Sequence, residues 1–111
     1  MSKDEDEKIQ SILTEPRSAA IKAMLEKDHA IDCIFLLYLN RGKWKPAKEF
    51  MRDNNLTISD GTFRSRMIEI EDLGLSKAVR IDPLKKRYEI TEFGEKVATL
   101  LLDFFEKLGS G

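Results

Sequence analysis

Small polar side chains and two guanidinium groups gather within residues 59–66, and these groups suit contacts with phosphates and base edges. An arginine can donate two parallel hydrogen bonds to O6 and N7 of guanine, and it can also pair with a phosphate. Small residues let a helix lie deep in the major groove of a duplex. The residues that would make these contacts are Ser59, Gly61, Thr62, Arg64, Ser65 and Arg66.

Further cations lie on both sides of this segment and suit phosphate oxygens. They are Lys43, Lys45, Lys48, Arg80, Lys85, Lys86 and Arg87. Residues 41–91 carry twelve Lys and Arg against eight Asp and Glu, a local charge of +4, although the whole chain has a net charge of −1. Local potential, more than total charge, attracts a polyanion. The alternative is that these cations only solvate the surface.

Few residues could support catalysis or bind a metal. The chain of 111 residues has one histidine, His29, and one cysteine, Cys33, and it lacks a Gly-rich phosphate loop. We therefore expect no enzyme activity, no metal and no cofactor. We interpret Cys33 as a core or interface thiol and leave a redox role open. The lone cysteine favours the cytoplasm, and no run approaches the ~20 apolar residues of a membrane helix.

The apolar pattern predicts a mainly α-helical chain with one small β-hairpin. Residues 1–13 are polar and acidic, which predicts a flexible tail, with a helix near Ile9–Leu13 left open. Helices are predicted over residues 14–25, 29–40, 46–54, 59–73 and 92–108, a short extended segment over 43–45, and strands over 75–81 and 87–90. Asp28 is the expected cap of the second helix, Gly74 the expected end of the fourth, and residues 82–86 the expected hairpin turn.

The helix over residues 59–73 has one apolar face. Phe63, Met67, Ile70 and Leu73 recur every three or four residues and predict the side that is buried. This arrangement turns both arginines and the neighbouring hydroxyl groups partly or fully outward. In the alternative interpretation, the two arginines solvate the helix and pair with its own carboxylates, Asp60, Glu69 or Glu71.

The last helix has more apolar surface than packing within one chain requires. Its apolar residues cover more than half of its circumference, so we expect it to pair with a second copy of the chain. The residues expected at this homodimer interface are Phe93, Val97, Leu100, Leu101, Phe104, Phe105 and Leu108. We expect the N-terminal helices to join the interface. The alternative is that all these helices pack only within one chain.

Two segments resemble winged helix-turn-helix transcriptional regulators, in particular the MarR-like and HxlR-like groups of the archaeal type. The run ISDGTFRSRMIEIEDLGL over 58–75 resembles their recognition helix and its exit, and RYEITEFG over 87–94 resembles the end of the wing and the start of the next helix. The resemblance covers residues 28–108. It implies a DNA-binding domain over 14–91, followed by a dimerisation helix over 92–111.

The resemblance implies a cytoplasmic, homodimeric regulator that binds double-stranded DNA. Its recognition helix would lie in the major groove, and its wing would contact the backbone or the minor groove. Replacing Arg66 would then relax sequence preference, whereas replacing Lys86 would weaken binding to all sequences alike. A small-molecule effector is left open. The alternative function is a winged-helix module that binds another protein and not DNA.

Overall fold

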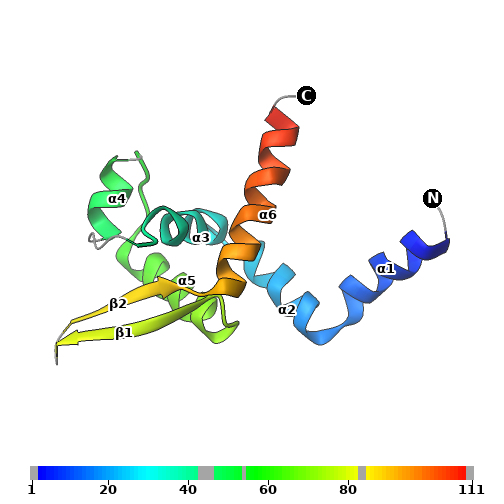
Figure 1. The fold of residues 1–111 in the computed structure, drawn as a ribbon, viewed down its shortest axis with the longest axis horizontal. Helices are drawn as coiled ribbons and strands as arrows, with labels where there is room; N and C mark the ends of the chain where they lie inside the picture. The colour runs from blue at the N-terminus through cyan, green and yellow to red at the C-terminus, as the bar shows by residue number, and fades with distance from the viewer. Residues whose placement is uncertain (1–2, 43–46, 54, 83–84, 110–111) are drawn as a thin grey trace.

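The computed structural model describes residues 3–42, 47–53, 55–82 and 85–109, which form six helices and one two-stranded antiparallel sheet (Figure 1). The helices are α1 (Lys3–Thr14), α2 (Pro16–Leu25), α3 (Ala30–Leu39), α4 (Ala47–Asp53), α5 (Asp60–Asp72) and α6 (Glu92–Gly109). The strands are β1 (Ser76–Asp82) and β2 (Lys85–Ile90). The expected mainly α-helical class with a small hairpin is confirmed.

The acidic N-terminal segment is a helix and not the flexible tail that we expected. Three acidic residues stand in the first turn of α1, where they interact favourably with the helix dipole. Residues 4–14 are all exposed, so α1 has no buried face within the chain. Glu15 then separates α1 from α2, because its carboxylate accepts hydrogen bonds from the backbone N–H groups of Arg17 and Ser18, at 3.1 and 2.7 Å.

The central helix of the core is α3. Its sequence is apolar almost all round, and it contacts α2, α4, α5, β2 and α6. The buried apolar residues of the chain are Met24, Ala30, Cys33, Ile34, Leu36, Leu37, Met51, Ile58, Met67, Ile70, Leu75 and Ala98. One core therefore joins α2, α3, α4, α5, β2 and α6.

The start of α3 differs from the prediction. His29, and not Asp28, is the N-cap residue, and its backbone has a left-handed φ of 62°. No side chain caps the helix, and the His29 ring Nδ1 lies 2.9 Å from a carboxylate oxygen of Asp32. The expected Asp28 cap was therefore wrong, because the chain turns into the helix one residue later.

The helix α5 begins and ends as its sequence predicts. The Ser59 hydroxyl accepts a hydrogen bond of 3.2 Å from a backbone N–H of the first turn. Met67 and Ile70 are buried, and Phe63 and Leu73 pack against the same core, so the predicted inner face is confirmed.

Gly74 ends α5 with a φ of 83°, a conformation that other residues rarely adopt. Its N–H donates to the carbonyl of Glu71 at 2.9 Å, and the N–H of Leu75 donates to the carbonyl of Ile70 at 3.1 Å. These two bonds satisfy carbonyl groups at the end of the helix and turn the chain directly into β1.

The hairpin extends further than the pattern of alternation predicts. Ser76 pairs with Ile90 at the base, and Asp82 pairs with Lys85 near the tip, with an irregularity in register between Arg80 and Asp82. The expected five-residue turn over 82–86 was therefore too long. Ladder hydrogen bonds are made by the backbone, so pairing continues through polar residues that break the side-chain pattern.

A tight junction joins the end of α5, both strands at their base and the start of α6. The Leu75 carbonyl accepts a hydrogen bond from the Thr91 N–H at 3.0 Å. The Thr91 hydroxyl donates to the Gly74 carbonyl at 2.7 Å and accepts from the Gly94 N–H at 3.0 Å. We call these four residues, Gly74, Leu75, Thr91 and Gly94, the junction.

Two parts of the chain project from the core. Helix α1 leads away to the N-terminus, and the C-terminal half of α6 rises away from the hairpin and α5 (Figure 1). The radius of gyration is 15.6 Å. A compact chain of this length would have a radius of about 13 Å. None of the described helices combines the length and apolar character that crossing a membrane requires.

The junction predicts a strong effect of substitution at Gly94. A Cβ atom there would lie 2.0 Å from the Leu75 carbonyl oxygen and 2.7 Å from the Ile90 side chain. Gly94→Ala should therefore lower the free energy of unfolding by about 3 kcal/mol, because α6 must shift from the hairpin base. Chemical denaturation followed by circular dichroism measures the change. Gly109→Ala, where a Cβ meets no atom within 4 Å, is the matched control and should remain as stable as the parent.

Candidate nucleic-acid interface

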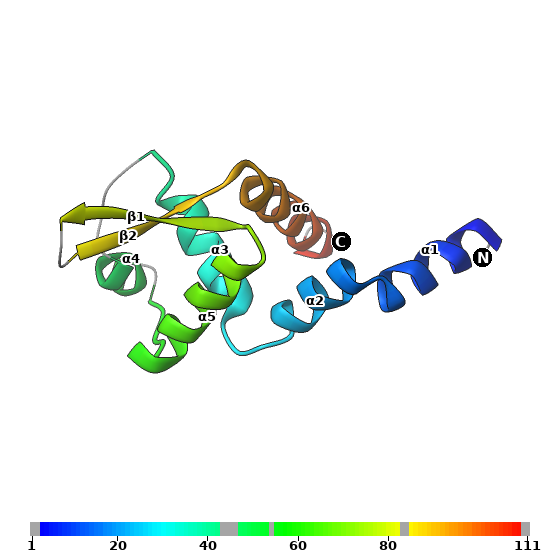
Figure 2. The same cartoon turned by 90° about the horizontal axis from the view of Figure 1, so that it is seen from below.

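One side of α5 faces away from the core along its whole length (Figure 2). At 100° per residue, four exposed residues lie within about 60° of one another around the helix axis. They are Gly61, Ser65, Ile68 and Asp72, and we call them the outer row. Two of the four have the smallest side chains in the helix, so the backbone near its N-terminus is accessible.

The hairpin lies beside one flank of α5, and this flank carries an exposed cation. A carboxylate oxygen of Glu71 accepts a hydrogen bond of 3.1 Å from the Ala78 N–H of β1. Arg64 lies on the same side of α5 as Glu71, two turns earlier. Arg64 and Arg80 of β1 are both exposed, and neither forms an ion pair with another described residue. Two unpaired guanidinium groups therefore stand on neighbouring elements.

The hydroxyl groups at the start of α5 serve the helix cap. Ser59 uses its oxygen to accept from the Thr62 N–H, and it also donates to the Thr62 hydroxyl at 2.9 Å. Ser59 is exposed and Thr62 is half-buried. Their outward lone pairs and the exposed Ser65 hydroxyl are the polar groups that this end of the helix offers to a partner.

Arg66 lies on the opposite flank of α5 and faces the α2–α3 connection, which contains Lys27 and Asp28. Its side chain is only 15% exposed. It pairs with the Glu69 carboxylate at 3.0 Å and reaches the Asp28 carbonyl at 3.5 Å. Lys27 of the same connection also pairs with Glu69. Arg66 is therefore only partly outward, and the alternative interpretation of a pair with Glu69 is confirmed.

This cluster of Lys27, Arg66 and Glu69 lowers the pKa of the Glu69 carboxyl below its ordinary value of 4.5. The largest cause is the hydrogen bond from Lys27, and the nearby charge of Arg66 adds to it. Burial acts in the opposite direction and is outweighed. The cluster ties α5 to the segment between α2 and α3, which lies about 40 residues earlier in the sequence. It therefore fixes the rotation of α5 on the core.

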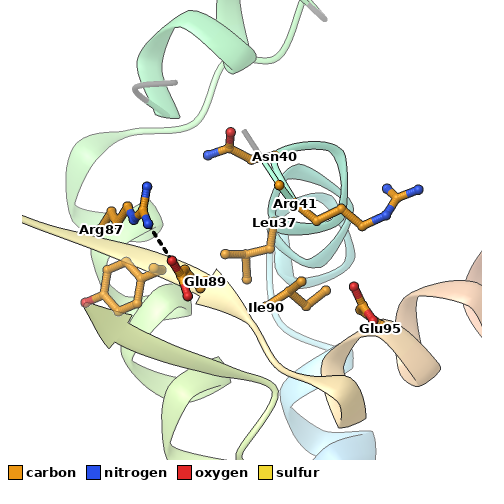
Figure 3. Close-up of a pocket in the computed structure, with 9 residues that line it drawn as sticks. Leu37, Asn40, Arg41, Arg87, Glu89, Ile90 and Glu95 are labelled. Atoms are coloured by element: carbon orange, nitrogen blue, oxygen red, sulfur yellow. Dashed lines mark hydrogen bonds and ion pairs between the residues drawn. The ribbon is translucent and has the colours of Figure 1, made fainter. Parts of the chain in front are cut away.

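Arg87 faces a polar cleft of about 470 Å³ between β2 and the ends of α3 and α6 (Figure 3). It pairs with Glu89 at 2.6 Å. Across the cleft, the Arg41 guanidinium stacks 3.7 Å from the centre of the Tyr38 ring. The lining residues are Leu37, Asn40, Arg41, Gly42, Arg87, Tyr88, Glu89, Ile90 and Glu95, in which two arginines balance two glutamates. Arg87 is thus partly engaged within the chain, unlike Arg64 and Arg80.

The predicted lysines are not described. Lys43 and Lys45 lie outside the described residues, and so do the side chains of Lys48, Lys85 and Lys86. The backbone places Lys48 in the first turn of α4, and Lys85 and Lys86 at the start of β2. The predicted phosphate contacts of these five lysines therefore stay predictions.

The seven residues predicted at a dimer interface divide into two groups along α6. Phe93, Val97 and Leu101 are half-buried and pack against the core. The other four are exposed, and Leu102 is exposed as well. The large apolar side chains exposed on this helix are therefore Leu100, Leu102, Phe104, Phe105 and Leu108. The Phe105 ring stacks edge-on with those of Phe35 and Phe104. The projecting half of α6 is thus an apolar surface that the described chain does not cover.

Cys33 is fully buried in α3, and burial raises the pKa of its thiol to about 12. The thiolate, which is the reactive form, is therefore almost absent at neutral pH. Within the described residues, no group of three or more His, Cys, Asp or Glu side chains could hold a metal ion.

Ile68 is not among the residues that the sequence predicted at this surface. Its residue type suggested no polar contact, yet its spacing places it outward: it follows Gly61 by seven residues and Arg64 by four. A helical projection of residues 59–73 would have found it, since Ile68 falls almost opposite Ile70.

Comparisons of the chain with models of protein families, with curated proteins and with solved structures find no match. The function is therefore argued from the surface of α5, the hairpin and α6 alone.

The Glu69 cluster predicts a dependence of stability on pH. A carboxyl group whose pKa is lowered by folding stabilises the fold above pH 4.5, and this contribution is lost as the pH falls through the folded-state pKa. Glu69→Gln should therefore lower the free energy of unfolding at pH 7, and the difference from the parent should shrink steadily below pH 4.5. Urea denaturation at several pH values measures it. Glu26→Gln, which removes an exposed pair with Lys22, is the control and should change stability little at any pH.

Proposed function

We propose that this chain is a winged helix-turn-helix protein that binds double-stranded DNA as a homodimer and regulates transcription. In this proposal α5 is the recognition helix in the major groove, and the β1–β2 hairpin is the wing on the backbone or in the minor groove. The single cysteine is free, which suits a reducing cytoplasm.

The order and packing of the elements support this proposal. Helices α3 and α4 are followed by α5, and α5 leads through the junction into a two-stranded hairpin. Both α4 and α5 pack on α3, so the outer side of α5 remains free. The base of the hairpin contacts α5 through Glu71 and the Ala78 N–H of β1, and the hairpin extends away from α5 toward its tip (Figure 2). In this proposal the hairpin would reach the DNA backbone beside the groove that α5 occupies.

The observation that carries the proposal is the combination of the outer row with two unpaired guanidinium groups. Gly61 and Ser65 let the α5 backbone approach a base pair, Arg64 is exposed on the same helix, and Arg80 is exposed on β1. Arginine is the most frequent reader of guanine and a strong phosphate ligand. We assign no base contact to Arg66, because its guanidinium is engaged with Glu69 and the Asp28 carbonyl.

The charges of α5 also fit this assignment, although the helix has more carboxylates than guanidinium groups. Glu69 is neutralised by Lys27 and Arg66, and Glu71 accepts a hydrogen bond from the β1 backbone. In the first half of the exposed side, Arg64 is the positive group, and Asp60, four residues earlier and also exposed, is a negative one. Asp72, at the far end of the outer row, is exposed and would be kept away from phosphates.

The projecting half of α6 supports the homodimer. Its exposed apolar residues continue the stripe that is buried in the first half of the helix, and α1 adds Ile9, Ile12 and Leu13, which are also exposed. A two-fold pair of such helices would bury both surfaces and present two copies of α5 to successive turns of DNA.

The first prediction from the proposed function concerns Arg64. Fluorescence anisotropy with a random-sequence duplex of about 30 base pairs, long enough for two half-sites, should detect binding that weakens steeply as salt rises. Duplexes enriched by selection from that pool should bind tighter. Arg64→Ala should weaken binding to the selected duplex by about 1–3 kcal/mol, or fivefold to 150-fold, because a guanidinium contact is lost.

Two variants control this measurement. Lys96→Ala removes one exposed positive charge from α6 and should leave the affinity unchanged within about twofold at moderate salt, since it lies outside the proposed interface. Arg66→Ala should lower the melting temperature, because Glu69 loses a partner.

Absence of salt-sensitive binding to any duplex would refute the DNA-binding proposal. Capture of a protein partner under the same conditions would then favour the protein-interaction module.

The second prediction concerns the dimer. Leu100 is 60% exposed, so Leu100→Glu should leave the monomer fold intact. In a two-fold interface the change occurs twice, and it should weaken the dimer at least tenfold, or by ~1.4 kcal/mol. Sedimentation equilibrium measures the dissociation constant. Thr99→Glu places the same charge on the polar side of α6 and should leave the dimer unchanged. A parent chain that sediments as a monomer at all concentrations would contradict the proposal.

A further inference from the structure

Ile68 is the one large apolar side chain of α5 that is exposed, and it is 45% accessible. The fold has no visible use for it there, since Met67 and Ile70 supply the buried contacts of this turn. A β-branched residue also favours a helix less than an unbranched one. Among the side chains that the structure describes, the other exposed large apolar residues lie on α1, on α6 and at the end of α3.

The neighbours of Ile68 on the outer row make it the most protruding group of that surface. Gly61 and Ser65 precede it and are small, so Ile68 is the first large side chain met by a flat or convex partner. The fold does not require Gly61 to be glycine, because a Cβ there would meet no atom within 4 Å and its φ is not positive. Packing within the chain therefore does not require the residue at position 61 to be small.

The major groove contains one apolar group that such a side chain fits. Guanine, adenine and cytosine present only donors and acceptors there, whereas thymine presents its C5 methyl group. Ile68 follows Arg64 by one helical turn, or about 6 Å along the axis, which corresponds to about two base-pair steps. An arginine and an isoleucine at this spacing can contact different bases of one half-site.

We propose that Ile68 reads a thymine through its C5 methyl group, about two base pairs from the base or phosphate that Arg64 contacts. This inference rests on the proposed function, with α5 in the major groove. It assigns to Ile68 a role in sequence preference and none in general attraction to DNA.

Replacement of thymidine by deoxyuridine tests the contact, because it removes only the methyl group. In a duplex selected for tight binding, each thymidine is replaced singly, and affinity is measured for the parent and for Ile68→Ala. At one position in each half-site, the replacement should lower the affinity of the parent about fourfold, the equivalent of ~0.8 kcal/mol for one buried methyl-sized group. Ile68→Ala should bind the thymidine and deoxyuridine duplexes equally at that position.

The matched control is Leu39→Ala, which removes an equally exposed aliphatic side chain, 44% accessible, from the end of α3. It should keep the full discrimination between thymidine and deoxyuridine. Tight binding of the parent without any such discrimination would overturn this inference and leave the proposed function in place, and so would a discrimination that persists in Ile68→Ala. Failure of the parent to bind any duplex would overturn both together.

Discussion

The contact between the Leu75 carbonyl and the backbone of residues 91–94 determines how the outer row of α5 is oriented relative to the apolar half of α6. Thr91 closes the hairpin base through its N–H and joins α5 to α6 through its hydroxyl. Gly94 lets α6 pass against the same carbonyl, where no larger residue fits. Because these bonds share two adjacent peptide groups, the direction of α5, the hairpin and α6 cannot vary independently. A loose connection at this point would leave the outer row and the apolar half of α6 without a fixed relation.

A second constraint fixes the rotation of α5 about its own axis. The core holds one side through Met67 and Ile70, and the pair of charged contacts from Lys27 and Arg66 to Glu69 holds one flank. Salt bridges at the surface usually contribute little, but the Arg66 side chain is only 15% exposed and pairs with Glu69, a carboxylate that it shares with Lys27. The outer row faces solvent because these two sets of contacts leave it no other orientation. Sequence-specific contact needs this fixed rotation, since a helix that turned freely could not hold one residue over one base.

Local signals in the sequence were sufficient to predict most element boundaries. Ser59, Gly74 and Thr91 act on the backbone within a few residues, so their effect can be predicted without the tertiary structure. Other features depend on distant residues. The orientation of Arg66 is decided by Lys27 and Asp28, about 40 residues earlier, and no periodicity within α5 contains that information. The helix α1 was missed for another reason, because its acidic start suggested disorder although the same charges stabilise a helix N-terminus. The candidate site was predicted in part: Gly61, Arg64, Ser65 and Arg80 are exposed as expected, whereas Arg66 is not and Ile68 was overlooked.

The length of α6 makes the close packing at Gly94 important for a distant part of the molecule. The part of α6 that follows Gly94 extends about 22 Å. A tilt of only about 10° at Gly94 would displace the far end by about 4 Å, more than the 3.4 Å rise of one base pair. A small change of angle at the start of α6 is therefore amplified at its far end. The close contact of Gly94 with the Leu75 carbonyl limits that angle, and so it would limit how accurately two copies of the chain could be aligned.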